Sequence, residues 1–137
     1  MYRYGFQQHR VRSAALSILS ISAALLAEPA LAAPAGDPVR GKQVFAQCAT
    51  CHAVVSGQNH VGPSLAGVVG RPAANTPGFT YSAAMQASHI VWNEPVLSAY
   101  LEAPAKVVAG TKMGYAGLAD PQKRADVIAY LKTKPAS

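Results

Sequence analysis

The only two cysteines of the chain stand beside a histidine in Cys48-Ala49-Thr50-Cys51-His52. Residues three apart lie about one turn apart on a helix, so both thiols can reach the same edge of a flat ring. Each thiol can add across a vinyl group of one porphyrin, and the histidine that follows can then reach the iron at its centre. This C-x-x-C-H pattern predicts covalent attachment of one haem c through Cys48 and Cys51, with His52 as an iron ligand.

Three other uses of a cysteine pair fit this sequence less well. A disulfide between cysteines at this spacing in a helix would be strained. A zinc site would need further soft ligands, and the chain has no third cysteine. A thioredoxin-like redox pair normally opens a helix within a βαβ pattern, which is absent from this sequence. Haem attachment is therefore the interpretation that we carry forward.

The first 32 residues have the composition of an export signal. Residues 1–12 carry three arginines and no acid, an apolar run follows at 14–27, and Ala30-Leu31-Ala32 supplies the small residues that signal peptidase recognises. The run is shorter than the roughly 20 apolar residues of a membrane span, so an uncleaved anchor is the weaker alternative. We predict a cleavable signal peptide at 1–32 and a periplasmic mature protein that begins at Ala33.

Residues 33–137 are predicted to form a single domain. A domain of about a hundred residues is marginal without a disulfide or a cofactor, and a buried haem would complete its apolar core. This part of the chain has nine basic and five acidic side chains, which gives a net charge of +4. The charge is mild and dispersed, so it suits an acidic protein partner and argues against nucleic acid.

Helices are predicted to position the haem motif, and no strand pattern is convincing. Asp37 followed by Pro38 predicts the start of the first helix. Apolar or small residues then recur on one face of that helix and lead into the motif: Gly41, Val44, Phe45 and Cys48. Residues 53–78 are rich in Gly, Pro and small polar residues and are predicted to be an ordered loop.

Three further helices are predicted from a capping residue followed by apolar spacing. One runs from Ser82 through Met85, one from Asn93 to a residue before Pro104, and one from Asp120 to a residue before Pro135. The predicted fold class is all-α.

The second axial ligand of the iron decides what such a haem can do. A vacant or labile site would suit gas binding or catalysis, whereas a firm ligand would suit electron transfer. The candidates are His60, His89, Met85 and Met113. Met113 lies between Gly110 and Gly114, whose freedom could bring a thioether onto the iron. Its local context fits a packing methionine equally well.

Taken together, the motifs resemble class I cytochromes c of the soluble mitochondrial and bacterial type. The resemblance covers residues 36–132, and the spacing between Phe45 and Cys48 is closer to that of bacterial members. It rests on motifs that occur in the order and spacing of that family: Cys48-x-x-Cys51-His52, Gly62-Pro63-Ser64-Leu65, Gly70-Arg71, Pro77-Gly78-Phe79-Thr80-Tyr81, Val91-Trp92-Asn93-Glu94, Tyr100-Leu101-Glu102, Pro104 and Gly110-Thr111-Lys112-Met113.

The resemblance implies a small cytochrome c fold, a helical shell with ordered loops around one haem, and a role for each site residue. It implies that Met113 is the second axial ligand and that the Pro63 carbonyl accepts a hydrogen bond from His52. It also implies that haem propionate is contacted by Arg71, Tyr81 and Trp92. Tyr100 would donate a hydrogen bond to the Met113 sulfur, and Thr111 would contact the cofactor. Gly41 and Phe45 would pack against Val127 and Tyr130 where the first and last helices cross.

Two departures from the family pattern bear on tuning and docking. Met85 stands where relatives usually have a polar residue, often asparagine, which would alter a buried water network and the reduction potential. Several lysines that surround the exposed haem edge in relatives are missing, although Lys42, Lys106 and Lys112 remain. Partners therefore cannot be carried over from the best-known relatives.

The resemblance implies a one-electron carrier and not an enzyme, and the sequence holds no evident catalytic acid–base set. The implied partners are redox proteins: a quinol-oxidising complex or a dehydrogenase as donor, and an oxidase or a reaction centre as acceptor. We expect a monomer that does not bind nucleic acid and does not stay in the membrane after cleavage. A small peroxidase and a gas-sensing haem module are the alternatives from other functional classes.

Overall fold

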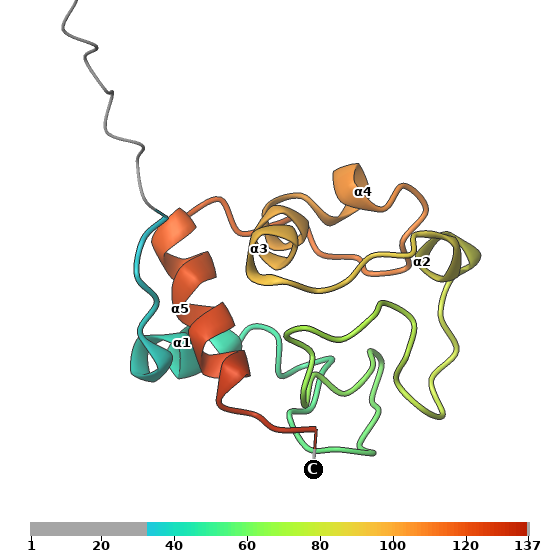
Figure 1. The fold of residues 1–137 in the computed structure, drawn as a ribbon, viewed down its shortest axis with the longest axis horizontal. Helices are drawn as coiled ribbons and strands as arrows, with labels where there is room; N and C mark the ends of the chain where they lie inside the picture. Colours follow the sequence, from blue (N-terminus) through green and yellow to red (C-terminus); the bar gives the residue numbers. More distant parts are fainter. Residues whose placement is uncertain (1–32, 137) are drawn as a thin grey trace, which may run out of the picture. The chain divides into compact units, whose positions relative to one another are not determined.

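The computed structural model describes residues 33–136, and the predicted export signal lies outside them. Five helices follow one another along the described chain (Figure 1): α1 (Pro38–Phe45), α2 (Ala83–Ala87), α3 (Glu94–Glu102), α4 (Pro104–Val107) and α5 (Pro121–Lys132). Within the described range the only β pairing is an isolated bridge between Pro72 and Val91. The predicted all-α class is confirmed.

Side-chain caps explain where four of the helices begin. The side chains of Asp37, Ser82, Asn93 and Asp120 accept hydrogen bonds from the first backbone N–H groups of α1, α2, α3 and α5. These N–H groups have no partner inside their own helix, so the cap stabilises each start. All four starts were predicted from the sequence, and the structure confirms them.

Helix α4 is an element that the sequence analysis did not predict. Pro104 was interpreted there only as the stop of the preceding helix. In the structure it also opens α4, which has no side-chain cap. Proline suits the first position of a helix because its missing N–H would be unpaired there in any case. One residue therefore ends one helix and begins the next.

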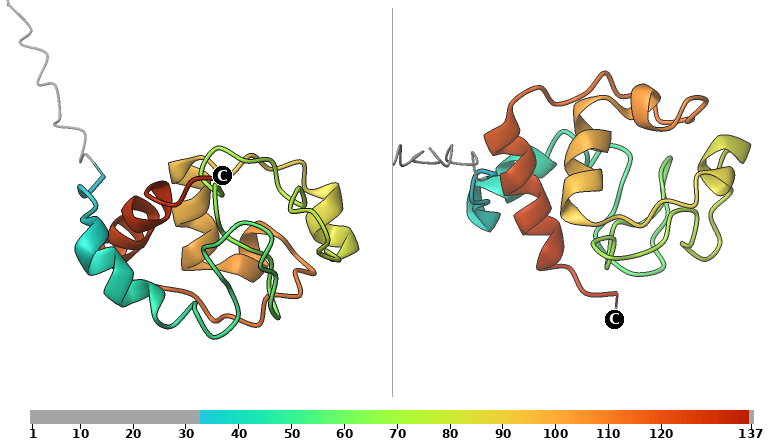
Figure 2. Two further views of the ribbon diagram at one scale, coloured as in Figure 1. Left: turned by 90° about the horizontal axis from the view of Figure 1, so that it is seen from below. Right: turned by 45° about the horizontal axis from the view of Figure 1, so that its top comes forward.

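The first and last helices pack closely against each other, as Figure 2 shows in both views. A Cβ atom added at Gly41 of α1 would lie only 1.9 Å from the backbone oxygen of Asp126 in α5. The Phe45 and Tyr130 rings pack beside this point, with centroids 5.3 Å apart, and Val127 is almost fully buried. The predicted crossing of the two helices is confirmed, and glycine is what permits their close approach.

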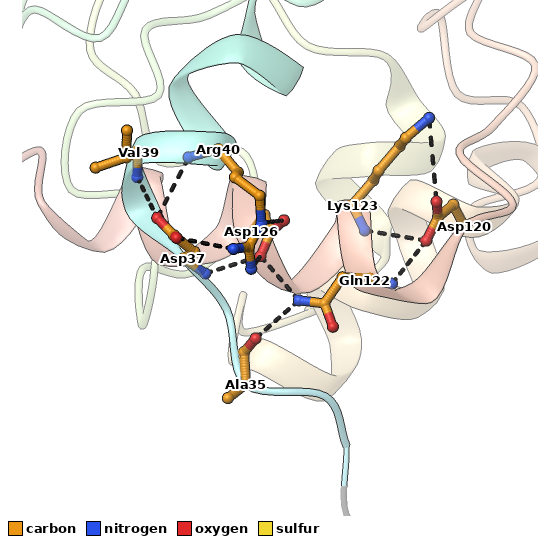
Figure 3. A network of polar contacts seen from close by, with 8 residues as sticks. All are labelled: Ala35, Asp37, Val39, Arg40, Asp120, Gln122, Lys123 and Asp126. Atoms are coloured by element: carbon orange, nitrogen blue, oxygen red, sulfur yellow. Dashed lines mark hydrogen bonds and ion pairs between the residues drawn. The ribbon is translucent and has the colours of Figure 1, made fainter.

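A polar network holds the start of α1 onto α5 (Figure 3). The buried carboxylate of Asp126 accepts hydrogen bonds from the Asp37 backbone N–H at 2.8 Å, from the Arg40 guanidinium at 2.8 and 3.1 Å, and from the Gln122 amide at 2.9 Å. Gln122 also donates to the Ala35 carbonyl at 2.8 Å. These bonds, those from Arg40 first, hold the pKa of Asp126 well below its usual range.

We expect Asp126→Asn to lower the free energy of unfolding at neutral pH. We also expect this free energy to fall less steeply in acid than it does in the wild type. A carboxyl group with a depressed pKa in the folded protein stabilises fully above its ordinary pKa of about 4, and this contribution falls as pH drops through the lower folded value. Guanidinium unfolding between pH 7 and pH 2 measures both effects. Asp120→Asn is the control, because asparagine still caps α5. Identical pH profiles for Asp126→Asn and wild type would contradict the prediction.

The apolar core is built around a hollow. Buried apolar side chains come from α1, α2, α3 and α5 and from the loops between them. Six of them also line a cavity: Val68, Met85, Trp92, Leu97, Tyr100 and Leu131. In residues 33–136, no helix is long and apolar enough to cross a membrane.

Candidate functional site

The cavity has a volume of about 560 Å³ and lies where the sequence analysis expects the cofactor. Its lining includes the three residues of the haem motif that carry chemistry, Cys48, Cys51 and His52, together with Met113. Most of the remaining lining is apolar, as in pockets that enclose a flat organic group. The cavity therefore brings together segments that are far apart in the sequence, and its lining suits a haem.

The haem motif continues the chain from α1 as a helical turn. The backbone N–H of Cys48 donates to Phe45 at 2.8 Å, and that of His52 donates to Cys48 at 2.9 Å. Both cysteines are free thiols and are partly buried. Burial, and then the neighbouring Cys51, raise the pKa of the Cys48 thiol. The turn thus presents two unpaired thiols and one imidazole to the same cavity.

A backbone carbonyl fixes the orientation of His52. The Nδ1 atom of the ring lies 2.8 Å from the Pro63 carbonyl oxygen. A carbonyl can only accept, so Nδ1 carries the proton and Nε2 keeps its lone pair for a metal. A Cβ at Gly62 would lie 2.3 Å from the imidazole carbon Cε1, so the ring is seated against a glycine. This arrangement fits an axial ligand of haem iron.

Met113 lies on a segment that side chains hold in place. The Tyr100 hydroxyl lies 3.0 Å from the Thr111 hydroxyl, and the Met113 backbone N–H donates to that same Thr111 oxygen at 3.3 Å. Gly110 supplies a left-handed turn with φ of +87° just before them. Burial raises the pKa of Tyr100, with the Thr111 bond acting against that shift. The sequence analysis gave Tyr100 a bond to the Met113 sulfur, whereas its bond in the structure is to Thr111.

The other candidates for the second axial position differ in whether they line the cavity. His60 and His89 are exposed and do not line the cavity. Met85 is buried in the core, only 8% exposed, and it does line the cavity. Two thioethers, those of Met85 and Met113, therefore share the cavity with His52.

Arg71, Tyr81 and Trp92 line the cavity together, as their implied role requires. The Arg71 guanidinium donates to the carbonyl groups of Ala66 at 2.7 Å and Ser64 at 3.0 Å. Its burial lowers its pKa, and among the described residues no carboxylate forms an ion pair with it. A half-buried cation without a protein counterion fits a ligand that brings its own carboxylates, as haem does.

Comparison with known proteins decides the family. The model of the family described as "Cytochrome c" matches residues 38–135. The chain belongs to the cytochrome c family. Cytochrome c2 of Rhodopila globiformis is 58% identical over 102 residues, which cover 74% of this chain and 96% of that protein. Cytochrome c2 of Rhodomicrobium vannielii is 50% identical, with coverage of 88% and 96%.

A solved structure agrees with this assignment. Cytochrome cH from Methylobacterium extorquens superposes with a TM-score of 0.70 at 44% identity, and the match covers 72% of this chain and all of that one. The fold predicted from the sequence, a small cytochrome c fold, is confirmed. This cytochrome is an electron carrier of the cytochrome c2 type and not an enzyme.

Arg124 is a residue of this cytochrome to which the sequence analysis gave no role. Its guanidinium is buried, donates to the Leu118 and Ala119 carbonyls at 2.7 and 2.8 Å and to the Ser98 hydroxyl at 3.1 Å, and lies 3.3 Å from the Glu102 carboxylate. It therefore fastens the chain a few residues after Met113 to α3 and α5. A hint was available in the sequence, because Arg124 stands three and four residues before Val127 and Ile128 and so shares their face of the last helix.

Proposed function

We propose that this cytochrome is a periplasmic one-electron carrier with one haem c, bound covalently by Cys48 and Cys51 and ligated by His52 and Met113. The observation that carries the proposal is the shared cavity. Both thiols, an imidazole whose free nitrogen is set by the Pro63 carbonyl, and the Met113 thioether all line it.

Each residue then has a defined task. When bound, the haem iron supplies a couple that takes up and releases one electron. Two thioether bonds from Cys48 and Cys51 keep the cofactor in place through repeated cycles. The Pro63 carbonyl raises the basicity of His52, and the soft sulfur of Met113 favours the reduced state relative to a second histidine. With His52 and Met113 both holding the haem, little in the protein would need to rearrange when the electron moves.

The polar side of the cavity has a separate task. Arg71, Tyr81 and Trp92 would hold haem propionate by charge and by hydrogen bonds from the phenol and the indole. A buried carboxylate needs such partners in order to stay ionised. Met85 and Leu97 add apolar surface elsewhere in the lining. With haem bound, this apolar lining would keep water away from the iron, which would raise the influence of every nearby charge.

Location and partners follow from the leader and the surface charge. The composition of residues 1–32 supports export to the periplasm and cleavage before Ala33. The proposed donors are a quinol-oxidising complex or a dehydrogenase, and the proposed acceptors are an oxidase or a reaction centre. The exposed cations Lys42, Lys106 and Lys112 would steer the encounter with an acidic partner. The electron carrier itself would act as a monomer.

Extraction tests the covalent attachment. We expect acid–acetone to leave the red colour with the polypeptide, because thioether bonds survive acid while axial ligands do not. Cys48→Ala and Cys51→Ala should each lower the yield of coloured protein at least about tenfold, since haem completes the core. Ala49→Ser, between the two cysteines, exposed and outside the cavity lining, is the control and should leave the yield unchanged. Haem released intact into the solvent by the wild-type protein would refute the proposal.

Carbon monoxide distinguishes an electron carrier from the haem proteins of other classes. A peroxidase or a gas sensor has an open or labile second axial site, so its reduced form binds carbon monoxide rapidly. The Met113 thioether would block that site in this cytochrome. Rapid binding by the reduced wild-type protein would contradict axial ligation by Met113 and favour one of those two classes.

A further inference from the structure

The backbone that carries Met113 forms backbone–backbone hydrogen bonds just before and just after residues 112–117. Thr111 donates its N–H to Val108 at 3.0 Å, and Leu118 donates to Leu101 at 2.8 Å. Within the described part of the chain, residues 112–117 take part in no backbone–backbone hydrogen bond. A Cβ at Gly114 would meet no atom within 4 Å, so there is open space beside the segment. We call residues 112–117 the Met113 segment.

Only one hydrogen bond in the described structure links the Met113 segment to the residue that precedes the haem motif. The Tyr115 hydroxyl donates to the Gln47 side-chain oxygen at 3.1 Å. Gln47 directly precedes Cys48, and Tyr115 is two residues beyond Met113. Both side chains line the same cavity as the proposed axial ligands. The bond therefore joins the segment that bears one proposed ligand to the segment that bears the other, 68 residues apart in the sequence.

We propose that this bond, the Gln47–Tyr115 clasp, positions Met113 by holding the Met113 segment closed against the haem motif. Tyr115 and Gln47 act through Met113 and are positioning residues. The inference rests on the proposed function, because it takes Met113 to be the second axial ligand. Without the clasp, the segment opens more often and a ligand from solution replaces Met113 faster.

The position of the clasp explains why it affects local opening more than global stability. Gln47 is exposed and Tyr115 is only partly buried, so a hydrogen bond between them adds little to the folding of the whole domain. The ends of the segment stay fastened when the middle moves, through Val108 before it and through Leu101 and Arg124 after it. Openings of such segments are governed by their few local contacts. Loss of this one contact should therefore change the population of the open segment about threefold.

Displacement of Met113 by imidazole measures this opening directly. The oxidised holoprotein is mixed with excess imidazole, and loss of the far-red absorption band is followed by stopped flow. Tyr115→Phe removes only the hydroxyl, and Gln47→Leu removes the acceptor at similar size. Each should accelerate displacement about threefold, and the double variant should be no faster than either single one, because all three lack the same bond. Gln47→Glu keeps an acceptor and should retain the slow rate. Gln58→Leu, at an exposed glutamine in another loop, should behave as wild type.

Guanidinium unfolding separates local from global effects. All variants should keep the free energy of unfolding of the wild type. Unchanged displacement rates in Tyr115→Phe and Gln47→Leu would overturn the clasp, as would additive effects in the double variant. The clasp would also be overturned if the free energy of unfolding fell by as much as the faster displacement corresponds to when it is expressed as a free energy. A far-red band that survives Met113→Ala would refute ligation by Met113, and the clasp with it. If the band is lost in Met113→Ala but the clasp variants behave as wild type, only the clasp is refuted.

Discussion

Met113→Ala should abolish the weak far-red absorption band of the oxidised cytochrome and lower its reduction potential by on the order of 100 mV. The thioether stabilises reduced iron more than oxidised iron, and alanine offers no ligand in its place. Water or an added ligand then reaches the site, so the reduced variant should also bind carbon monoxide rapidly. Absorption spectroscopy follows the far-red band and the binding of carbon monoxide, and a redox titration at pH 7 gives the reduction potential.

The control that matters most for this result is Met85→Leu. Met85 and Met113 both line the cavity, so position alone leaves two thioethers as candidates. Leucine fills nearly the volume of methionine, so the core around residue 85 should tolerate it. The band should survive in Met85→Leu and also in His60→Ala, since His60 is exposed. A band that disappears in Met85→Leu and persists in Met113→Ala would reverse the assignment.

Gly41→Val should cost about 3 kcal/mol of the free energy of unfolding or more, and a large part of the yield of folded protein. The added Cβ would lie 1.9 Å from the backbone oxygen of Asp126 and 2.8 Å from the Tyr130 Cβ. Neither atom lies at the end of a flexible side chain, so α1 and α5 must move apart. That movement separates Phe45 from Tyr130 and loosens the buried side of both helices.

Lys42→Val is the matched control for Gly41→Val. Residue 42 is exposed on the same helix, so valine there meets no clash. By helix propensity alone Gly41→Val would be the more favourable of the two changes, because glycine is the poorer helix former. Guanidinium unfolding at pH 7 of both variants isolates the effect of the crossing. A Gly41→Val protein within about 1 kcal/mol of Lys42→Val would show that the helices can separate at little cost.

The features that could be predicted from the sequence alone are those that depend only on neighbouring residues. Asp37, Ser82, Asn93 and Asp120 each cap a helix through their own side chains and the next few N–H groups, so the helix starts could be found without tertiary information. The haem motif is likewise local, because five consecutive residues bring two thiols and an imidazole together. The cavity confirms that these groups face a common space.

Contacts between distant residues were predicted only where the family resemblance supplied them. The approach of Pro63 to His52 and of Gly41 to Tyr130 came from that source. Arg124 and the Gln47–Tyr115 clasp did not, because a polar side chain carries no local sign of which distant carbonyl or amide it will meet. The hydrogen bond between Tyr100 and Thr111 was not predicted for the same reason, and the contact of Tyr100 with the Met113 sulfur stays a prediction.

The packing of α1 on α5 also ties the haem motif to the far end of the chain. α1 spans eight residues, which is too short to be stable alone, and the surface that it buries belongs to the last helix. Until α5 docks, the cysteines that follow α1 are held by no docked helix, so we expect haem to be joined to them before the terminal helices close. A chain that ends before Pro121 should therefore still accept haem.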